Sequence, residues 1–260
     1  MIADIKGKIS SSGSNLSERL EDNLTGNVFG ALRYIPFSAN MGKILANAVY
    51  PESVGKEIRD IQDGFWADKV QFWPYDREGE LDTLIEFENI MIGIEVKYKS
   101  GLSSDDDISN NLDGESMNKE EMRKSIHQLA RESRIISRKG NNKKKILLFI
   151  ADRHSCKEVY EDILKRGILE SDVLFGCAPW QNFLFHLKKL KEADPYHQVI
   201  INDVIALLIQ KGFEDFTSML IDIPNPINER QYFQFTLEDK LKANFQIDLS
   251  IKGGLYYEFS

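Results

Sequence analysis

The sequence predicts an α/β protein in which helices flank a central mixed β-sheet, followed by a small C-terminal β-rich extension. Two observations predict this class. Segments with apolar residues at every third or fourth position alternate with short apolar runs, as they do where helices cover a sheet. One of these runs, residues 146–151, is almost wholly apolar, which is typical of a central strand buried on both faces.

The N-terminal half is expected to begin with two helices. Apolar residues recur at steps of about four until Pro36 ends the pattern, which predicts a first helix: Leu16, Leu20, Leu24, Val28, Leu32 and Ile35. A short second helix is predicted at 41–49. Strands are then predicted at 69–73, 81–87 and 90–98. We expect the last two strands to form a hairpin whose turn is centred on Glu88-Asn89, because Asn tolerates the left-handed conformation.

The second half continues the alternation. Residues 101–115, with three consecutive Asp residues, predict a loop, and residues 118–138 a basic helix. The remaining elements are predicted as a strand at 146–151, a helix at 155–166, a strand at 172–177 and helices at 180–191 and 196–211. We therefore assign residues 1–215 to one domain and residues 216–260 to a β-rich extension packed on it, with strands at 231–236, 245–251 and 256–259.

Composition excludes several classes of protein. No apolar run approaches the roughly 18–20 residues that span a bilayer, and the N-terminus lacks the apolar core of a signal peptide, so we expect a cytoplasmic protein without membrane contact. Cys156 and Cys177 have neither metal-ligand nor redox spacing and are expected to be reduced thiols. The sequence has no Gly-rich phosphate loop, no Ser nucleophile elbow and no zinc-finger pattern. Any ATP hydrolysis must therefore come from a partner.

Charge is unevenly distributed along the chain. The net charge is −8, yet residues 119–145 hold ten Lys or Arg against three acids, one of which is Glu132. Two interpretations stay open on charge alone. The segment is either a solvated helix face followed by a charged loop, or a surface that binds an acidic partner such as the backbone of a nucleic acid.

The strand at 90–98 alternates in character. Ile92, Ile94, Val96 and Tyr98 share one face, and Gly93, Glu95, Lys97 and Lys99 share the other. The second face presents a carboxylate and an amine about 6.6 Å apart along the strand, at a rise of ~3.3 Å per residue. We expect Gly93 to leave this face open.

The hairpin brings a second carboxylate to the same face. If its turn is centred on Glu88-Asn89, paired residue numbers sum to 177, which puts Asp82 opposite Glu95 and Glu80 opposite Lys97. Two facing carboxylates repel each other, and a bound divalent cation such as Mg²⁺ is a reason to keep them. Lys97 would then orient or help to deprotonate the attacking water, or offset charge on a phosphate. This set of groups suits phosphodiester hydrolysis, whereas the alternative is a surface hairpin with charges on its wet face.

Asp82, followed thirteen positions later by Glu95-Val96-Lys97 on a strand, resembles the PD-(D/E)xK motif of restriction-endonuclease-like nucleases. The resemblance covers roughly residues 15–180 and departs from the motif where Leu81 replaces the proline. It implies a restriction-endonuclease-like fold, and it implies that Asp82, Glu95 and Lys97 are catalytic. It also implies a Mg²⁺ site, in which Mn²⁺ can substitute, made by Asp82, Glu95, Val96 and a first-helix glutamate.

Two further sets of residues are implied by the resemblance. Glu21 matches the first-helix glutamate, with Glu18 one turn earlier as a competitor and a solvated helix acid as the alternative for both. Gln128, on the helix after the motif, resembles a glutamine that supports the site or contacts DNA. The expected nucleic-acid contacts are Gln128, Arg131, Lys124 and Arg134.

The resemblance implies a Mg²⁺-dependent deoxyribonuclease similar to the nuclease components of bacterial anti-phage defence and restriction systems. Cutting a second strand requires another protomer or a repositioned one, so a homodimer or a sensor or ATPase partner is expected. Two alternatives remain. One is a catalytically silent nucleic-acid-binding or assembly subunit, and the other is an RNase or repair nuclease with the same site.

Overall fold

The computed structural model describes residues 16–98, 127–191 and 194–215, with side chains from residue 20 onward. Five strands form one sheet, in the spatial order β1 (Val70–Phe72), β4 (Thr83–Glu86), β5 (Ile90–Val96), β6 (Lys144–Ala151) and β7 (Val173–Pro179). β1, β4 and β5 pair antiparallel, whereas β5, β6 and β7 pair parallel. The predicted α/β class with a mixed sheet is therefore confirmed, and residues 146–151 lie in its interior as expected.

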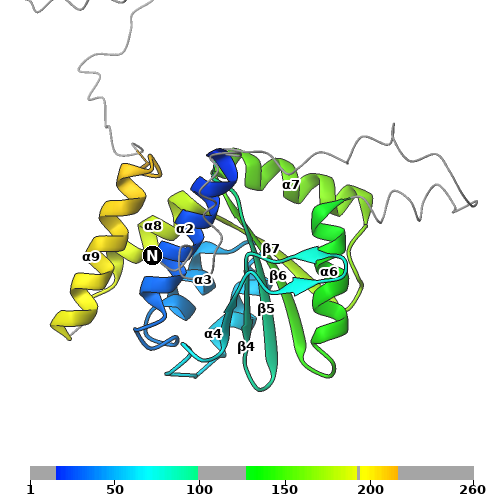
Figure 1. Ribbon diagram of the computed structural model, residues 1–260, viewed down its shortest axis with the longest axis horizontal. Coiled ribbons are helices and arrows are strands. Elements are labelled where there is room, and N and C mark those ends of the chain that lie inside the picture. Colours follow the sequence, from blue (N-terminus) through cyan, green and yellow to red (C-terminus); the bar gives the residue numbers. More distant parts are fainter. Residues whose placement is uncertain (1–15, 99–126, 192–193, 216–260) are drawn as a thin grey trace, which may run out of the picture. The chain divides into compact units, whose positions relative to one another are not determined.

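Helices cover both faces of this sheet (Figure 1). α6 (Gln128–Lys139) and α7 (Arg153–Arg166) pack on one face, because the crossovers between successive parallel strands carry them to the same side. The other face packs against helices from the two ends of the described chain. These are α2 (Leu16–Leu32), α3 (Met41–Ala48), α4 (Glu52–Arg59), α8 (Trp180–Lys189) and α9 (Pro195–Gln210).

Helix boundaries are set by local chemistry. α7 begins at Asp152, whose side chain accepts hydrogen bonds from the backbone N–H of His154 (2.9 Å) and Ser155 (3.1 Å). It ends at Gly167, which has a left-handed φ of 56°. α9 begins with Pro195 after the capping Asp194. Both cysteines are buried and free, so they are core thiols.

Several elements differ from the prediction. α4 was not predicted, because its surface sequence contributes only Val54 and Ile58 as apolar core residues. A small hairpin of β2 (Tyr75–Asp76) and β3 (Gly79–Glu80) was also missed. Glu80 pairs with Tyr75 there, so the prediction that it lies opposite Lys97 is wrong. The predicted loop at 101–115, the start of the basic helix and the C-terminal extension lie outside the described residues.

The β4–β5 hairpin has the predicted register. Thr83 pairs with Ile94 and Leu84 with Gly93, so the numbers sum to 177, and the Phe87 N–H donates to the Ile90 carbonyl around the turn. The reason given for the turn was wrong. Among the described non-glycine residues, positive φ occurs at Trp73 and Asn141, so Asn89 does not adopt the left-handed conformation.

The expectation that Gly93 leaves its strand face open is also wrong. A Cβ at Gly93 would lie 2.3 Å from Ile136 Cδ1 and 2.9 Å from Ile136 Cγ1 on α6. The absence of a side chain lets α6 approach this face of β5 closely. The face that carries Glu95 is therefore covered by a helix, and Glu95 is buried beneath it.

We predict that Gly93→Ala destabilises the fold by about 1–3 kcal/mol, because Ile136 is buried and cannot move away without displacing α6. Urea unfolding measures the change. Gly64→Ala is the control, since no atom lies within 4 Å of its added Cβ, and it should change stability by about 0.5 kcal/mol or less. Gly93→Ala should cost less in an Ile136→Val background, which lacks the contacting methyl group. Equal costs in the two backgrounds would contradict this packing account.

Candidate active site

The three residues of the predicted motif meet where β5 ends. Asp82 precedes β4, and its Oδ2 accepts a hydrogen bond from the Val96 N–H at 2.7 Å. The ladder between β4 and β5 stops at Thr83, and the Asp82 carbonyl accepts from the Trp73 N–H on the β1 side. Asp82 therefore reaches across to β5 with its side chain rather than as a paired strand residue. Val96, which was predicted in the metal set, fixes the Asp82 carboxylate.

Glu95 is the centre of the site. The residue is 2% exposed, and its Oε1 lies 2.8 Å from Lys97 Nζ. Gln128 Nε2, at the start of α6, donates to the same oxygen at 2.6 Å. Gln128 was expected either to support the site or to contact DNA, and its contact with Glu95 is the supporting one.

Glu21 joins the site from α2. Its Oε1 accepts from the Tyr98 N–H at 3.1 Å, and its Oε2 lies 3.6 Å from Lys97 Nζ. Glu21 is 7% exposed, so it is not a solvated helix acid. The side chain of Glu18, the competing residue, lies outside the described part. Lys97 is thus an ammonium shared by two carboxylates, and its own carbonyl accepts from the Trp180 indole at 3.1 Å.

Glu132 was missed as a site residue, having been counted only as an acid in the basic segment. It lies on α6 one turn after Gln128, and its side chain is 2% exposed. A signal in the sequence marks it: Leu129, Glu132 and Ile136 recur at helical spacing and form the stripe of α6 that faces the sheet. A carboxylate within an apolar stripe indicates a buried acid.

Burial dominates the electrostatics of the site. It raises the pKa of Glu95 to about 8, and the neighbouring Glu132 carboxylate adds to the rise. Burial likewise raises the pKa of Glu132 to about 8, and that of Asp82 well above its ordinary range with help from Glu95. Burial alone would lower the pKa of Lys97, but the charges of Glu95 and Glu21 raise it overall. The raised pKa values mean that the ionised carboxylates are poorly compensated by Lys97 alone, so a bound cation would stabilise them.

The donor chemistry fits Mg²⁺, since every carboxylate supplies hard oxygen ligands. Within the described ranges, no three or more His, Cys, Asp or Glu side chains converge closely enough to hold an ion by themselves. Mg²⁺ needs fewer, because it commonly binds to one or two carboxylates and completes its shell with water and substrate phosphate. Asp82 and Glu95, which interact electrostatically, have the ligand chemistry of such a pair.

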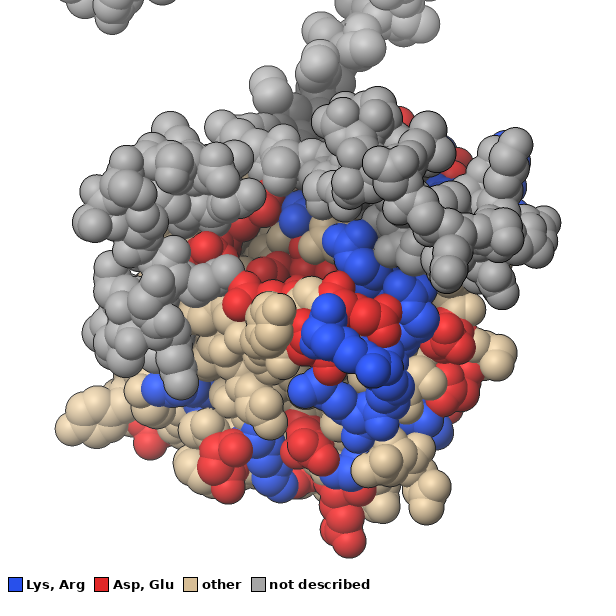
Figure 2. All heavy atoms as spheres, turned by 45° about the vertical axis from the view of Figure 1, so that its right-hand side comes forward, with Lys and Arg blue, Asp and Glu red and all other residues tan. Residues whose placement is uncertain are grey.

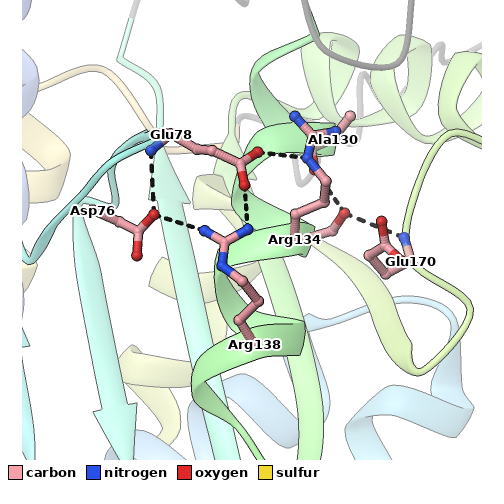
Figure 3. A network of polar contacts seen from close by, with 7 residues as sticks. Asp76, Glu78, Ala130, Arg134, Arg138 and Glu170 are labelled. Atoms are coloured by element: carbon pink, nitrogen blue, oxygen red, sulfur yellow. Dashed lines mark hydrogen bonds and ion pairs between the residues drawn. The ribbon is translucent and has the colours of Figure 1, made fainter. Parts of the chain in front are cut away.

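The basic segment is used largely for internal ion pairs. Figure 2 shows Lys and Arg side chains gathered beside Asp and Glu side chains where α6 comes forward. Arg134 Nε lies 2.5 Å from Glu78 Oε2, and Arg138 contacts both Glu78 and Asp76 (Figure 3). Arg134, a predicted nucleic-acid contact, is thus held by the β2–β3 hairpin. Arg131 is partly exposed on α6, and Lys124 lies outside the described residues.

The three lysines that precede or open β6 are structural. Lys143 lies 2.7 Å from Glu86, Lys145 lies 2.7 Å from Asp172, and Lys144 pairs with Glu57. Lys144 pairs with Ile90 in the ladder, at the opposite end of β5 from Val96. Six residues at ~3.3 Å each separate the two ends by about 20 Å. These lysines therefore cannot contact a phosphate bound beside Lys97.

Comparisons of the chain with protein-family models, with curated proteins and with solved structures find no match. None of the described helices has the length and apolar character needed to cross a membrane.

We predict that, in EDTA, the melting temperature falls as the pH rises from about 6.5 to 8.5. Glu95 and Glu132 have pKa values of about 8 in the folded protein, against 4.5 for the ordinary carboxyl. Their contribution to the stability of the fold is therefore complete at low pH and is lost as the pH rises through 8. The pKa of His186 is lowered, so this residue changes the stability of the fold only below this pH range. Thermal unfolding across the pH series measures the slope, which Glu95→Gln/Glu132→Gln should flatten. A wild-type melting temperature that rises with pH would contradict the assignment.

Proposed function

We propose that the protein is a Mg²⁺-dependent endonuclease of restriction-endonuclease-like fold that hydrolyses phosphodiester bonds in DNA. The observation that carries the proposal is the convergence of Asp82, Glu95 and Lys97 at one end of β5, with the Glu95–Lys97 contact at 2.8 Å. A buried ion pair is costly to assemble and is often less stable than apolar packing. Its presence beneath α6 supports a chemical role rather than a structural one.

Each side chain has a distinct task in this proposal. Asp82 and Glu95 would hold the metal, with Glu21 beside Lys97. The bound ion would lower the pKa of a coordinated water and offset charge on the scissile phosphate. Lys97 was expected either to help deprotonate the water or to offset phosphate charge. Its raised pKa keeps it protonated, which favours the second role. Gln128 and the Val96 N–H hold the two carboxylates in place.

The proposed biological role is supported by the resemblance of the Asp82, Glu95 and Lys97 motif to that of known nucleases. It supports a cytoplasmic nuclease of a bacterial anti-phage defence or restriction system that works as a homodimer or with a sensor or ATPase subunit. A catalytically silent binding or assembly subunit is less compatible with the geometry, because it would have no use for the buried carboxylates around Lys97. An RNase or repair nuclease would share the same site, so the substrate must be decided by assay.

We predict that Asp82→Asn and Lys97→Ala each lower cleavage by about 100-fold or more, as expected when a group that stabilises developing charge is removed. Plasmid DNA and single-stranded RNA are incubated with Mg²⁺ or Mn²⁺, with the protein alone and with the products of neighbouring genes. Lys56→Ala is the matched control, because Lys56 pairs only with Glu52 on the surface of α4 in the described structure. Equal cleavage by wild type and both site variants would overturn the proposal, and cleavage of RNA alone would reassign the substrate.

We predict that Glu78→Gln strengthens DNA binding, because it removes the ion pair that holds Arg134 at the β2–β3 hairpin and leaves Arg138 paired with Asp76 alone. The binding constant should depend more steeply on salt, by about one unit of logarithmic slope for each additional phosphate that the arginines bind. Fluorescence anisotropy with a labelled duplex in EDTA measures both quantities without cleavage. Glu57→Gln frees Lys144 at the far end of β5 and should leave binding unchanged. Weaker binding by Glu78→Gln would show that the arginines serve the fold alone.

A further inference from the structure

Glu132 is a buried acid that the motif does not account for. Glu132 is 2% exposed on the face of α6 that covers Glu95, and it lies beside the side chains of Glu95 and Gln128. Within the described structure neither of its carboxylate oxygens makes a hydrogen bond of regular geometry. Gln128, one turn earlier on α6, donates to Glu95. Consecutive turns of one helix therefore bring an amide and a carboxylate to the same end of β5.

The neighbouring residue on α6 shows that a buried polar group here can be satisfied. The Ser133 hydroxyl donates to the Ala130 carbonyl at 2.9 Å and accepts from the Glu170 N–H at 3.2 Å. Glu132 has no such arrangement within the described ranges, although a buried carboxylate without a donor is far more costly than a buried hydroxyl. The rest of the buried stripe consists of residues such as Leu129 and Ile136, so an apolar side chain at this position would pack more favourably.

A cation is the ligand that compensates such a group. Glu132 and Glu95 are both almost fully buried, and the nearby ammonium of Lys97 is already shared by Glu95 and Glu21. Two carboxylates supply hard oxygen donors, and water or a phosphate oxygen completes the shell of Mg²⁺ or Mn²⁺. A neutral ligand would leave the Glu132 carboxylate uncompensated.

We propose that Glu132 is a metal-binding residue of this protein, a carboxylate supplied by α6 that shares a divalent cation with Glu95. The inference rests on the proposed nuclease function and adds a ligand that the strand motif lacks. It makes the position of α6 part of the metal site, because moving the helix would move one of the ligands.

Mn²⁺ binding in the absence of nucleic acid tests the proposal. Isothermal titration gives the affinity, and the melting temperature with and without Mn²⁺ gives a second readout. Glu132→Gln, which is nearly isosteric, should lower Mn²⁺ affinity at least about tenfold. In EDTA at pH 9, where the Glu132 carboxylate is ionised, the same variant should melt at or above the wild-type temperature, because it removes a buried charge. This opposite sign separates a ligand from a residue that only stabilises the fold.

Two further variants distinguish the alternatives. Glu132→Asp keeps the charge but withdraws the oxygens by one methylene, so weakened Mn²⁺ binding supports direct ligation and unchanged binding overturns it. Ser133→Ala removes the adjacent buried polar group and should lower the melting temperature without changing Mn²⁺ affinity. Wild-type affinity in Glu132→Gln alongside loss in Asp82→Asn would overturn the role of Glu132 and leave the proposed function standing. Absence of Mn²⁺ binding by the wild type, with and without DNA, would overturn both.

Discussion

The burial of Glu95 between β5 and α6 is the constraint on which the rest of the site depends. A carboxylate that is 2% exposed must be compensated, and here Lys97 and Gln128 both bind the same oxygen. Lys97 also contacts Glu21 of α2, and this helix packs on the other face of the sheet. The contacts of one buried carboxyl group thus connect the helices on both faces of the sheet at the C-terminal end of β5.

Gly93 makes this arrangement possible. It lies two residues before Glu95 on the same strand face, and a side chain there would collide with Ile136. Without one, α6 comes close enough for its first two turns to bring Gln128 and Glu132 to the site. The missing side chain was expected to expose the carboxylate. Its effect is the reverse, since it brings the covering helix nearer and lowers the polarity around Glu95.

Periodicity accounts for the parts of the site that could be predicted from the sequence. Alternation along β5 determines which residues share the face of Glu95, and the turn at Glu88-Asn89 determines the register of the hairpin. Contacts between residues far apart in the sequence could not be predicted from periodicity. The hydrogen bond from the Val96 N–H to the Asp82 side chain lies beyond the end of the strand ladder, and the burial of Glu132 depends on which side of α6 meets the sheet. α4 was missed because two apolar residues give too weak a helical pattern.

The charge of a segment is a poor guide to the charge that it presents. Residues 119–145 are strongly basic, yet Arg134, Arg138 and the lysines at 143–145 form ion pairs with acids from other elements. The acids in these ion pairs contribute to the net charge of −8. They neutralise positive charge that the basic segment would otherwise present. A nucleic acid approaching α6 would compete with Glu78 and Asp76 for the arginines. The β2–β3 hairpin therefore sets how much positive charge lies beside the site, and it does so with two side chains.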